Sequence, residues 1–156
     1  MLHNRLKINN LQGDEPDFVR PANARCEFKA SGETATLEIY DIVSRWGASH
    51  RLVKEALKAS TAKEITVKIN SPGGDVFEGL AIYNELKSHQ AKIRVEVVAL
   101  AASIASIIAM AGDEILIADN AFIMVHNSWT VAAGDSREMT DAANVLAKID
   151  KGFQRT

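Results

Sequence analysis

The stretch 63-KEITVKINSPGGDVFEGLAIYNELK-87 has the pattern of a strand, a sharp break and a helix. In its first part, apolar residues alternate with polar ones, which predicts a strand with one buried face; they are Ile65, Val67 and Ile69. The Ser-Pro-Gly-Gly sequence at 71–74 ends that pattern. Beyond it, apolar residues recur at helical spacing, at Val76, Leu80, Tyr83 and Leu86.

The same alternation continues on both sides of this unit. Strand patterns occupy 33–42, 92–100, 114–118 and 121–126. Helical patterns occupy 49–60, about 102–111 and 136–153, the last with a stripe of Met139, Ala142, Leu146, Ile149 and Phe153. A chain that alternates strands and helices in this way folds as a parallel sheet covered by helices. We therefore predict the α/β class.

The composition is that of an ordinary globular domain. The 156 residues include 47% apolar and 24% charged side chains, with a formal net charge of −2. This balance gives no electrostatic reason to expect nucleic acid or an anionic membrane as a partner. The single cysteine, Cys26, cannot form an internal disulfide and has no Cys/His cluster beside it, so we expect a small buried or half-buried apolar residue and no zinc site.

The first 24 residues have no regular pattern. Pro16 and Pro21 interrupt any helix there, and no apolar run resembles a signal peptide. We expect a flexible N-terminal arm at 1–24, a single domain at 25–156 and a cytoplasmic location.

One uncharged run of sixteen residues, from Val97 to Gly112, needs an explanation. A membrane-spanning helix requires about 20 apolar residues, so Glu96 and Asp113 close the run too early. A buried element is the better interpretation. It contains two serines, Ser103 and Ser106.

Two strand-to-helix junctions are candidate sites, because ligands of parallel sheets gather where strands end and helices begin. At the first, 69-INSPGGDV-76, Gly73 and Gly74 allow a close backbone approach, or the segment is a turn that Ser71 or Asp75 caps. A phosphate loop is disfavoured, since no Gly-Lys-Ser/Thr follows.

The second junction is 100-LAASIAS-106. A serine there can cap the helix, bond back to a carbonyl, or act as a nucleophile, and the small alanines beside Ser103 leave room for an approaching group. A serine nucleophile needs a base. Of the four histidines, His126 is the best placed, at the end of an apolar strand, although a histidine in such a position is more often a hydrogen-bonded structural residue.

Three segments in this order resemble the ClpP-type serine peptidases, particularly their phage and prophage relatives similar to head-maturation proteases. They are 69-INSPGGDVFEGLAIYNELK-87, 99-ALAASIASIIAMAGD-113 and 122-FIMVHNSW-129, and the resemblance extends over about 33–150. It implies a ClpP/crotonase-like fold, with parallel-sheet βαβ units covered by helices and a long C-terminal helix.

The resemblance also implies the site. The family's nucleophile falls on Ser103, its general base on His126, and its oxyanion-binding amides on Gly74 and Ile104, with Ser106 as the competing nucleophile. The implied reaction is peptide hydrolysis by acyl transfer, which needs no metal or organic cofactor.

Partners follow from the same resemblance. It implies a polypeptide substrate and a ring-type homo-oligomer that assembles through the helix at 136–153. Packing within the chain would also explain the apolar stripe of that helix. ClpP itself works with an ATP-driven unfoldase, whereas the phage-like relatives are expected to act on capsid or scaffold protein. Two other functions stay open: a catalytically silent assembly module, and a crotonase-like acyl-CoA enzyme.

The chain departs from the family pattern in two respects. The acid that orients the histidine comes late in family members, so we expect it beyond Thr156 and interpret the chain as truncated, the alternative being a poor catalyst that lacks the acid. The acids that follow His126 are Asp135, Glu138, Asp141 and Asp150, and Asp135 is the nearest substitute. Ala99-Leu100 and Ile104-Ala105 replace pairs that are Gly-Gln and Met-Gly in many ClpP sequences, which favours the phage-like branch.

Overall fold

The computed structural model describes residues 5–6 and 26–154. The chain divides into two compact units, Met1–Met124 and Val125–Thr156. Among the described residues, the first contains the sheet and helices α1 to α3, and the second contains helix α4 (Ser136–Phe153) with the segment that precedes it. The predicted arm at 1–24 lies outside the described residues except for β1 (Arg5–Leu6).

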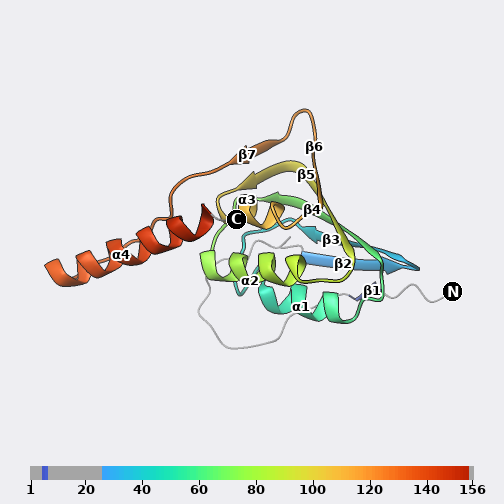
Figure 1. Cartoon of the computed structure of the whole chain (residues 1–156), viewed down its shortest axis with the longest axis horizontal. Helices are drawn as coiled ribbons and strands as arrows, with labels where there is room; N and C mark the ends of the chain where they lie inside the picture. Colours follow the sequence, from blue (N-terminus) through green and yellow to red (C-terminus); the bar gives the residue numbers. More distant parts are fainter. Residues whose placement is uncertain (1–4, 7–25, 155–156) are drawn as a thin grey trace. The chain divides into compact units, whose positions relative to one another are not determined.

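The described strands form a seven-stranded sheet in the order β1-β2-β3-β4-β5-β6, with β7 also paired to β5 (Figure 1). Its central and C-terminal pairs are parallel, whereas β1-β2 and β2-β3 are antiparallel. The predicted α/β class is confirmed. The strands are β2 (Cys26–Ser31), β3 (Thr34–Ile39), β4 (Glu64–Ser71), β5 (Lys92–Ala102), β6 (Glu114–Ile117) and β7 (Phe122–Met124).

Strand β2 was not predicted from the sequence. It forms a hairpin with β3 through a turn that contains Gly32, where φ is +61°. Of its six residues only Phe28 is buried, so its apolar alternation is too weak to indicate a strand.

The long strand β5 pairs with two strands along one edge. Residues Arg94–Val97 pair with β6, and Leu100–Ala102 pair with β7. Because this second ladder holds residues 100–102 in the sheet, α3 is shorter than predicted and runs only from Ile104 to Ala109. Strand exit and helix start are therefore separated by a single residue, Ser103.

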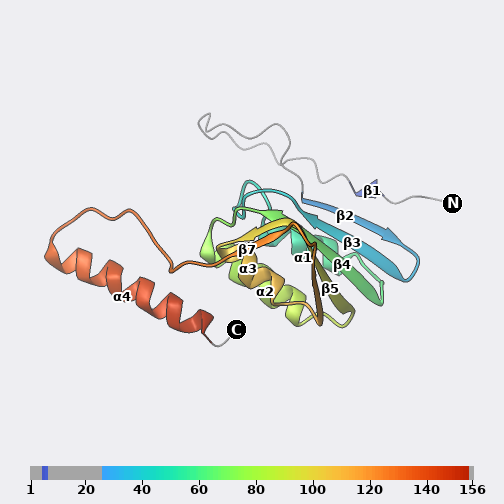
Figure 2. The same ribbon diagram turned by 90° about the horizontal axis from the view of Figure 1, so that it is seen from above.

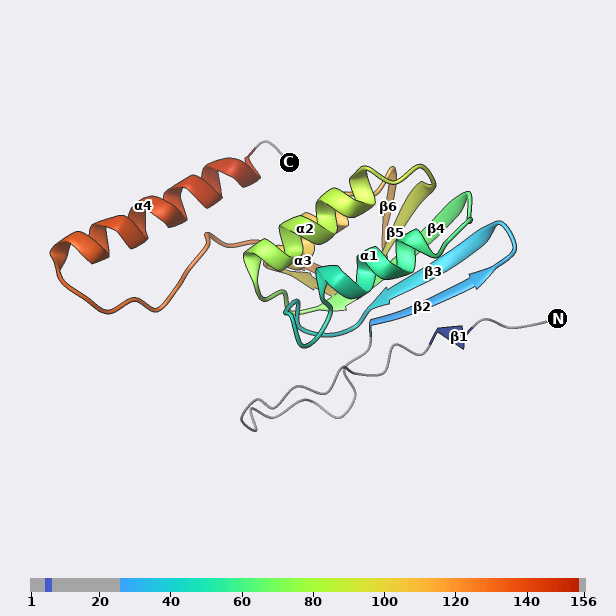
Figure 3. The ribbon, with the colours of Figure 1, turned by 90° about the horizontal axis from the view of Figure 1, so that it is seen from below.

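Helices α1 (His50–Lys58) and α2 (Val76–Lys87) lie side by side against one face of the sheet (Figures 1 and 3). Figure 2 shows the sheet as the layer above them. The alternating apolar residues of β3, β4 and β5 are buried, as predicted, and include Leu37, Ile39, Ile65, Val67, Ile69, Ile93 and Val95.

The apolar stripe predicted for α2 is wrong in its details. The buried residues are Gly79, Ile82 and Leu86, whereas Val76, Leu80 and Tyr83 are only half-buried. The periodic pattern locates the apolar half of a helix, but the most deeply buried line depends on which neighbours pack against it. Here α2 contacts both α1 and α3, and its line of closest packing passes through Gly79.

Glycine at position 79 lets α2 approach α3. A Cβ there would lie 2.2 Å from Cγ1 of Ile104, which no real pair of atoms tolerates. Glycine inside a helix costs about 1 kcal/mol relative to alanine, so this residue opposes helix formation locally and is explained by packing.

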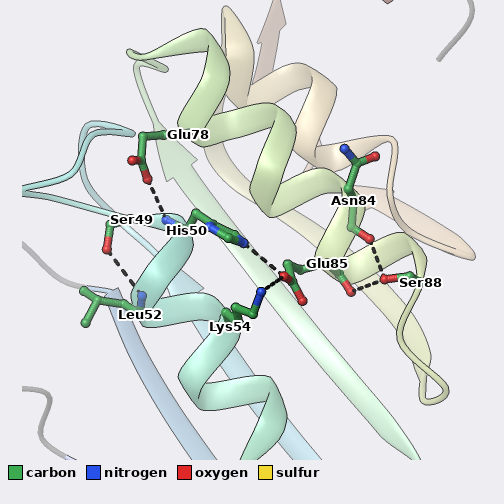
Figure 4. A network of polar contacts seen from close by, with 8 residues as sticks. All are labelled: Ser49, His50, Leu52, Lys54, Glu78, Asn84, Glu85 and Ser88. Atoms are coloured by element: carbon green, nitrogen blue, oxygen red, sulfur yellow. Dashed lines mark hydrogen bonds and ion pairs between the residues drawn. The ribbon is translucent and has the colours of Figure 1, made fainter.

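A polar cluster of half-buried side chains joins α1 and α2 (Figure 4). The Glu85 carboxylate lies 3.0 Å from both His50 Nε2 and Lys54 Nζ, and the backbone N–H of His50 donates to Glu78 Oε2 at 2.8 Å. Hydrogen bonds from His50 and then Lys54 lower the pKa of Glu85 below its usual value.

In the second unit, α4 begins at a capping box. The Asp135 carboxylate accepts hydrogen bonds from the backbone N–H groups of Arg137 and Glu138, and the Glu138 carboxylate accepts one from the N–H of Asp135. The helix bounds match the prediction, and no residue of α4 is fully buried.

We expect Gly79→Ala to lower the free energy of unfolding by about 1–3 kcal/mol, because the added methyl overpacks against Ile104. Denaturant unfolding measures the effect. The matched control is Gly152→Ala in α4, where a Cβ meets open space and helix propensity favours alanine. Equal stability of Gly79→Ala and the wild type would contradict this packing account.

We expect Glu85 to make the stability depend on pH. Its pKa is lowered by folding, so its ionised form stabilises the fold fully above the unfolded pKa of about 4.3, and this contribution disappears as the pH falls through the lowered value. Thermal unfolding of Glu85→Gln should therefore show a lower midpoint near neutral pH and converge with the wild type in acid. Glu55→Gln, which removes an exposed α1 ion pair with Arg51, should change little at any pH. A constant difference between Glu85→Gln and the wild type at every pH would contradict the assignment.

Candidate active site

The two predicted junctions meet at one edge of the sheet. Strands β4 and β5 are parallel, and Ser71 at the end of β4 pairs with Ala101 near the end of β5. The segment 72–75 that follows β4, called the glycine loop below, lies directly against Ser103, which follows β5. A Cβ on Gly73 would lie 2.7 Å from the Cβ of Ser103 and 2.5 Å from the carbonyl oxygen of Ala102. The φ of Gly73 is +88°, so only glycine satisfies both the space and the backbone here.

A loop that the sequence did not single out holds this glycine loop in place. The N–H of Val43 donates to the carbonyl of Gly73 at 2.8 Å, and the N–H of Asp75 donates to the carbonyl of Val43 at 2.7 Å. Val43 is fully buried, yet residues 41–48 show no periodic pattern that would have identified them. Their contribution is made by backbone groups, which leave no signal in the residue types.

The alternative roles proposed for Ser71 and Asp75 are both resolved. Asp75 caps α2, since its carboxylate accepts from the N–H groups of Phe77 and Glu78. Ser71 does not cap the helix. Its buried hydroxyl donates to the carbonyl of Asp41 at 2.6 Å and accepts from the N–H of Gly73 at 3.1 Å, which ties the loop at 41–48 to the glycine loop.

Two backbone amides of this region have no acceptor in the described part of the chain. They are the N–H groups of Gly74 and Ile104. The nitrogen of Ile104 lies 3.1 Å from the position that a Cβ of Gly73 would take, so it borders the glycine loop. Unpaired amides beside a serine are the donors that an oxyanion needs.

Ser103 has a strained backbone. It is the one non-glycine residue with positive φ in the part of the chain that the structure describes, at φ 53° and ψ −128°. Such a conformation costs about 1–3 kcal/mol and persists only where the surroundings impose it. Its N–H donates to the carbonyl of Met124 at the end of β7, at 2.8 Å, and its side chain does not cap α3. A sharp strand-to-helix turn with a strained serine is the geometry of a nucleophile elbow.

Ser106 has the structural role that an interior serine can take. It is 3% exposed, and its hydroxyl donates to the carbonyl of Ser103 at 2.6 Å. This hydrogen bond uses the hydroxyl proton of Ser106. The two serines therefore differ in function: Ser103 has the strained turn, and Ser106 supports it.

His126 is exposed and belongs to the second unit, two residues beyond Met124. The sequence had suggested that His126 closes the preceding apolar strand. Strand β7 instead ends at Met124, and His126 follows it. Two of the other histidines have clear structural roles. The ring of His50 lies beside Glu85, and Nδ1 of His89 accepts from the N–H of Ala91.

The acids after His126 also have identifiable partners. Asp135 and Glu138 form the capping box of α4, and the Asp150 carboxylate accepts from the N–H of Ser128 at 2.8 Å. Capping thus accounts for Asp135 without a catalytic role.

Other chemistries find little support among the described residues. Burial, reinforced by the charge of Asp41, raises the pKa of the Cys26 thiol to about 12, so it is not a thiolate nucleophile at neutral pH. Within 5–6 and 26–154, no group of three or more His, Cys, Asp or Glu side chains is arranged to hold a metal ion. No helix in those ranges is long and apolar enough to cross a bilayer.

Comparison with known proteins identifies the family. The sequence profile described as Clp protease matches residues 39–156. Three similar proteins are each named ATP-dependent Clp protease proteolytic subunit. That of Ligilactobacillus salivarius (strain UCC118) is 40% identical over 91 residues, covering 57% of this chain and 46% of the relative. That of Pleurastrum terricola is 31% identical over 113 residues, covering 69% and 58%. That of Deinococcus radiodurans is 33% identical over 89 residues, covering 56% and 44%.

The chain therefore belongs to the Clp protease family. It spans about half the length of the curated relatives that it matches. The ClpP-type resemblance stated from the sequence is confirmed at this level, and the narrower assignment to a phage branch stays a prediction.

We expect Gly73→Ala to disrupt this site. The added Cβ would overlap Ser103 and the carbonyl of Ala102 in a backbone conformation that alanine rarely adopts, so the unfolding free energy should fall by about 1–3 kcal/mol. Denaturant unfolding measures the loss. Pro72→Ala is the neighbouring control, since Pro72 is exposed. Wild-type stability of Gly73→Ala would contradict the close approach of the two junctions.

Proposed function

We propose that this protein is a serine endopeptidase in which Ser103 is the nucleophile and His126 the general base. The observation that carries the proposal is the strained conformation of Ser103 at a strand-to-helix turn, directly against the glycine loop. Strain of this kind gathers at functional sites, because the surrounding structure must stabilise it and a structural residue has no need of it.

Chain connectivity supports His126 as the base. The N–H of Ser103 is bonded to the carbonyl of Met124, and His126 follows Met124 by two residues. Two residues span at most about 7 Å, so covalent geometry keeps the Cα of His126 within that distance of the Cα of Met124. This short connection to Met124, the partner of the Ser103 N–H, is what supports His126 as the base.

The reaction would proceed by acyl transfer. Ser103 Oγ attacks the carbonyl carbon of a peptide bond while His126 takes its proton, and the imidazolium then gives that proton to the leaving amine. Water, activated by the same histidine, hydrolyses the acyl-enzyme and releases the second product. No bond in this sequence requires a metal or an organic cofactor.

The amides of Gly74 and Ile104 would stabilise the oxyanion of each tetrahedral intermediate. Both lack an acceptor in the described chain, and both border Gly73, whose backbone contacts Ser103. Loss of one such donor typically costs about 3–4 kcal/mol of transition-state stabilisation. The acid that would orient His126 is not assigned, since Asp135, Glu138 and Asp150 serve the structure of the second unit.

The substrate and partners are proposals of the same kind. The relatives are named as proteolytic subunits of an ATP-dependent protease. We therefore expect a polypeptide substrate, a ring-type homo-oligomer and an ATP-driven unfoldase as partner, in the cytoplasm. Capsid or scaffold maturation is a narrower prediction that rests only on the departures at Ala99-Leu100 and Ile104-Ala105.

A serine-reactive fluorophosphonate tests the proposal, because it reacts only with an activated serine. We expect the wild type to be labelled on Ser103, as located by peptide mass spectrometry, and Ser103→Ala to show no labelling. His126→Ala should lower the rate by a factor of about 10³ or more, since the base is lost. Hydrolysis of a fluorogenic peptide should fall in parallel.

The matched control is Ser88→Ala. Ser88 lies at the far end of α2 from the glycine loop and, like Ser106, donates to a nearby backbone carbonyl, that of Asn84 at 2.7 Å (Figure 4). The Ser88→Ala variant should be labelled on Ser103 at the wild-type rate. A folded wild type that takes up no label would refute the peptidase, leaving the silent assembly module or the acyl-CoA enzyme. A label on Ser106 would refute the assignment of the nucleophile.

A further inference from the structure

We propose that Ser106 is a positioning residue that holds the carbonyl of Ser103 and so fixes the strained turn of the nucleophile. The inference rests on the proposed role of Ser103. It concerns a residue that the peptidase mechanism does not use and that the sequence offered only as a competing nucleophile.

Ser106 donates two hydrogen bonds to the carbonyl of Ser103. The carbonyl oxygen of Ser103 accepts from the backbone N–H of Ser106 at 2.9 Å and from the Ser106 hydroxyl at 2.6 Å. Ser106 thus supplies two donors to this one carbonyl, beside the intrahelical bond that an N-cap carbonyl ordinarily accepts. The hydroxyl is the shorter contact, and Ser106 is 3% exposed, which protects the bond from competition by water.

The strained backbone of Ser103 needs to be held in place. Its peptide groups are restrained on both sides: the N–H by the carbonyl of Met124, at 2.8 Å, and the carbonyl by Ser106. At φ 53° and ψ −128°, the residue relaxes to a negative φ unless these groups are held. The backbone N–H of Ser106 makes only the i→i+3 bond that is common at helix ends. The added hydroxyl bond therefore strengthens the restraint at the one carbonyl whose rotation would move the Ser103 side chain.

The Ser103 carbonyl is also linked to one of the proposed oxyanion donors. The peptide that carries the Ser103 carbonyl also carries the N–H of Ile104, because both belong to one planar unit. A hydroxyl that fixes the carbonyl direction thereby fixes the opposite direction of that N–H. Ser106 thus orients two elements of the proposed machinery together, the nucleophile's backbone and one oxyanion amide.

The test compares fluorophosphonate labelling rates and peptide hydrolysis in Ser106→Ala and Ser106→Thr. Ala removes the donor, and we expect about a fivefold to tenfold lower labelling rate and kcat, with KM unchanged, the factor that one hydrogen bond corresponds to. Thr retains a hydroxyl that bonds back to a carbonyl of the preceding turn, and should restore the rate to within about twofold. If the added methyl of Thr prevents folding, Ser106→Cys replaces it, with a weaker donor and an intermediate rate expected.

Ser88→Ala is the matched control, because it removes the same kind of serine-to-carbonyl bond at the distant end of α2. Thermal unfolding of every variant is measured beside the rates, and at equal stability only Ser106→Ala should be slow. Labelling of Ser106→Ala at the wild-type rate would overturn the positioning role while the peptidase stands. A loss of activity that appears only in KM would also overturn it. The same holds if Ser106→Thr and Ser106→Cys are as slow as Ser106→Ala. Absence of labelling in the wild type would instead be a failure of the proposed function.

Discussion

The backbone of Gly73 lies against Ser103 so closely that a single added carbon would overlap both Ser103 and the carbonyl of Ala102. This contact joins the two strand-to-helix junctions of a parallel sheet. It requires that β4 and β5 end at the same edge, and the pairing of Ser71 with Ala101 provides that register. It also requires that α3 approach α2, which Gly79 permits by leaving space for Ile104.

Several weak features combine to hold this arrangement. The loop at 41–48 contributes a bridge from Val43 to the glycine loop, and Ser71 adds a side-chain bond to the same loop. The second ladder of β5, with β7, keeps residues 100–102 extended up to the turn and binds the N–H of Ser103. Each of these interactions is an ordinary hydrogen bond of about 1 kcal/mol, but together they impose on Ser103 a conformation that it would not adopt alone.

The two serines of the uncharged run show how residue type and environment differ in what they specify. Both occur among alanines and isoleucines, and both were candidates for the same chemistry. The hydroxyl of Ser106 is buried and bonded to a carbonyl, whereas Ser103 is half-exposed and its side chain leaves the helix N-terminus uncapped. The two serines differ because Ser103 lies in the strained turn itself, whereas Ser106 lies three residues further along, inside α3.

The sequence by itself determined the α/β class, most strand and helix positions, the bounds of α4, and the two junctions from which the candidate site is built. Those features depend on local periodicity and on glycine and proline, which act over a few residues. It did not determine β2, the buried line of α2 or the loop at 41–48. These depend on which elements pack together and on backbone hydrogen bonds, and neither leaves a pattern in residue types. Only the tertiary structure decided which serine has the strained turn, because that conformation is imposed by contacts with segments distant in sequence, around Gly73 and Met124.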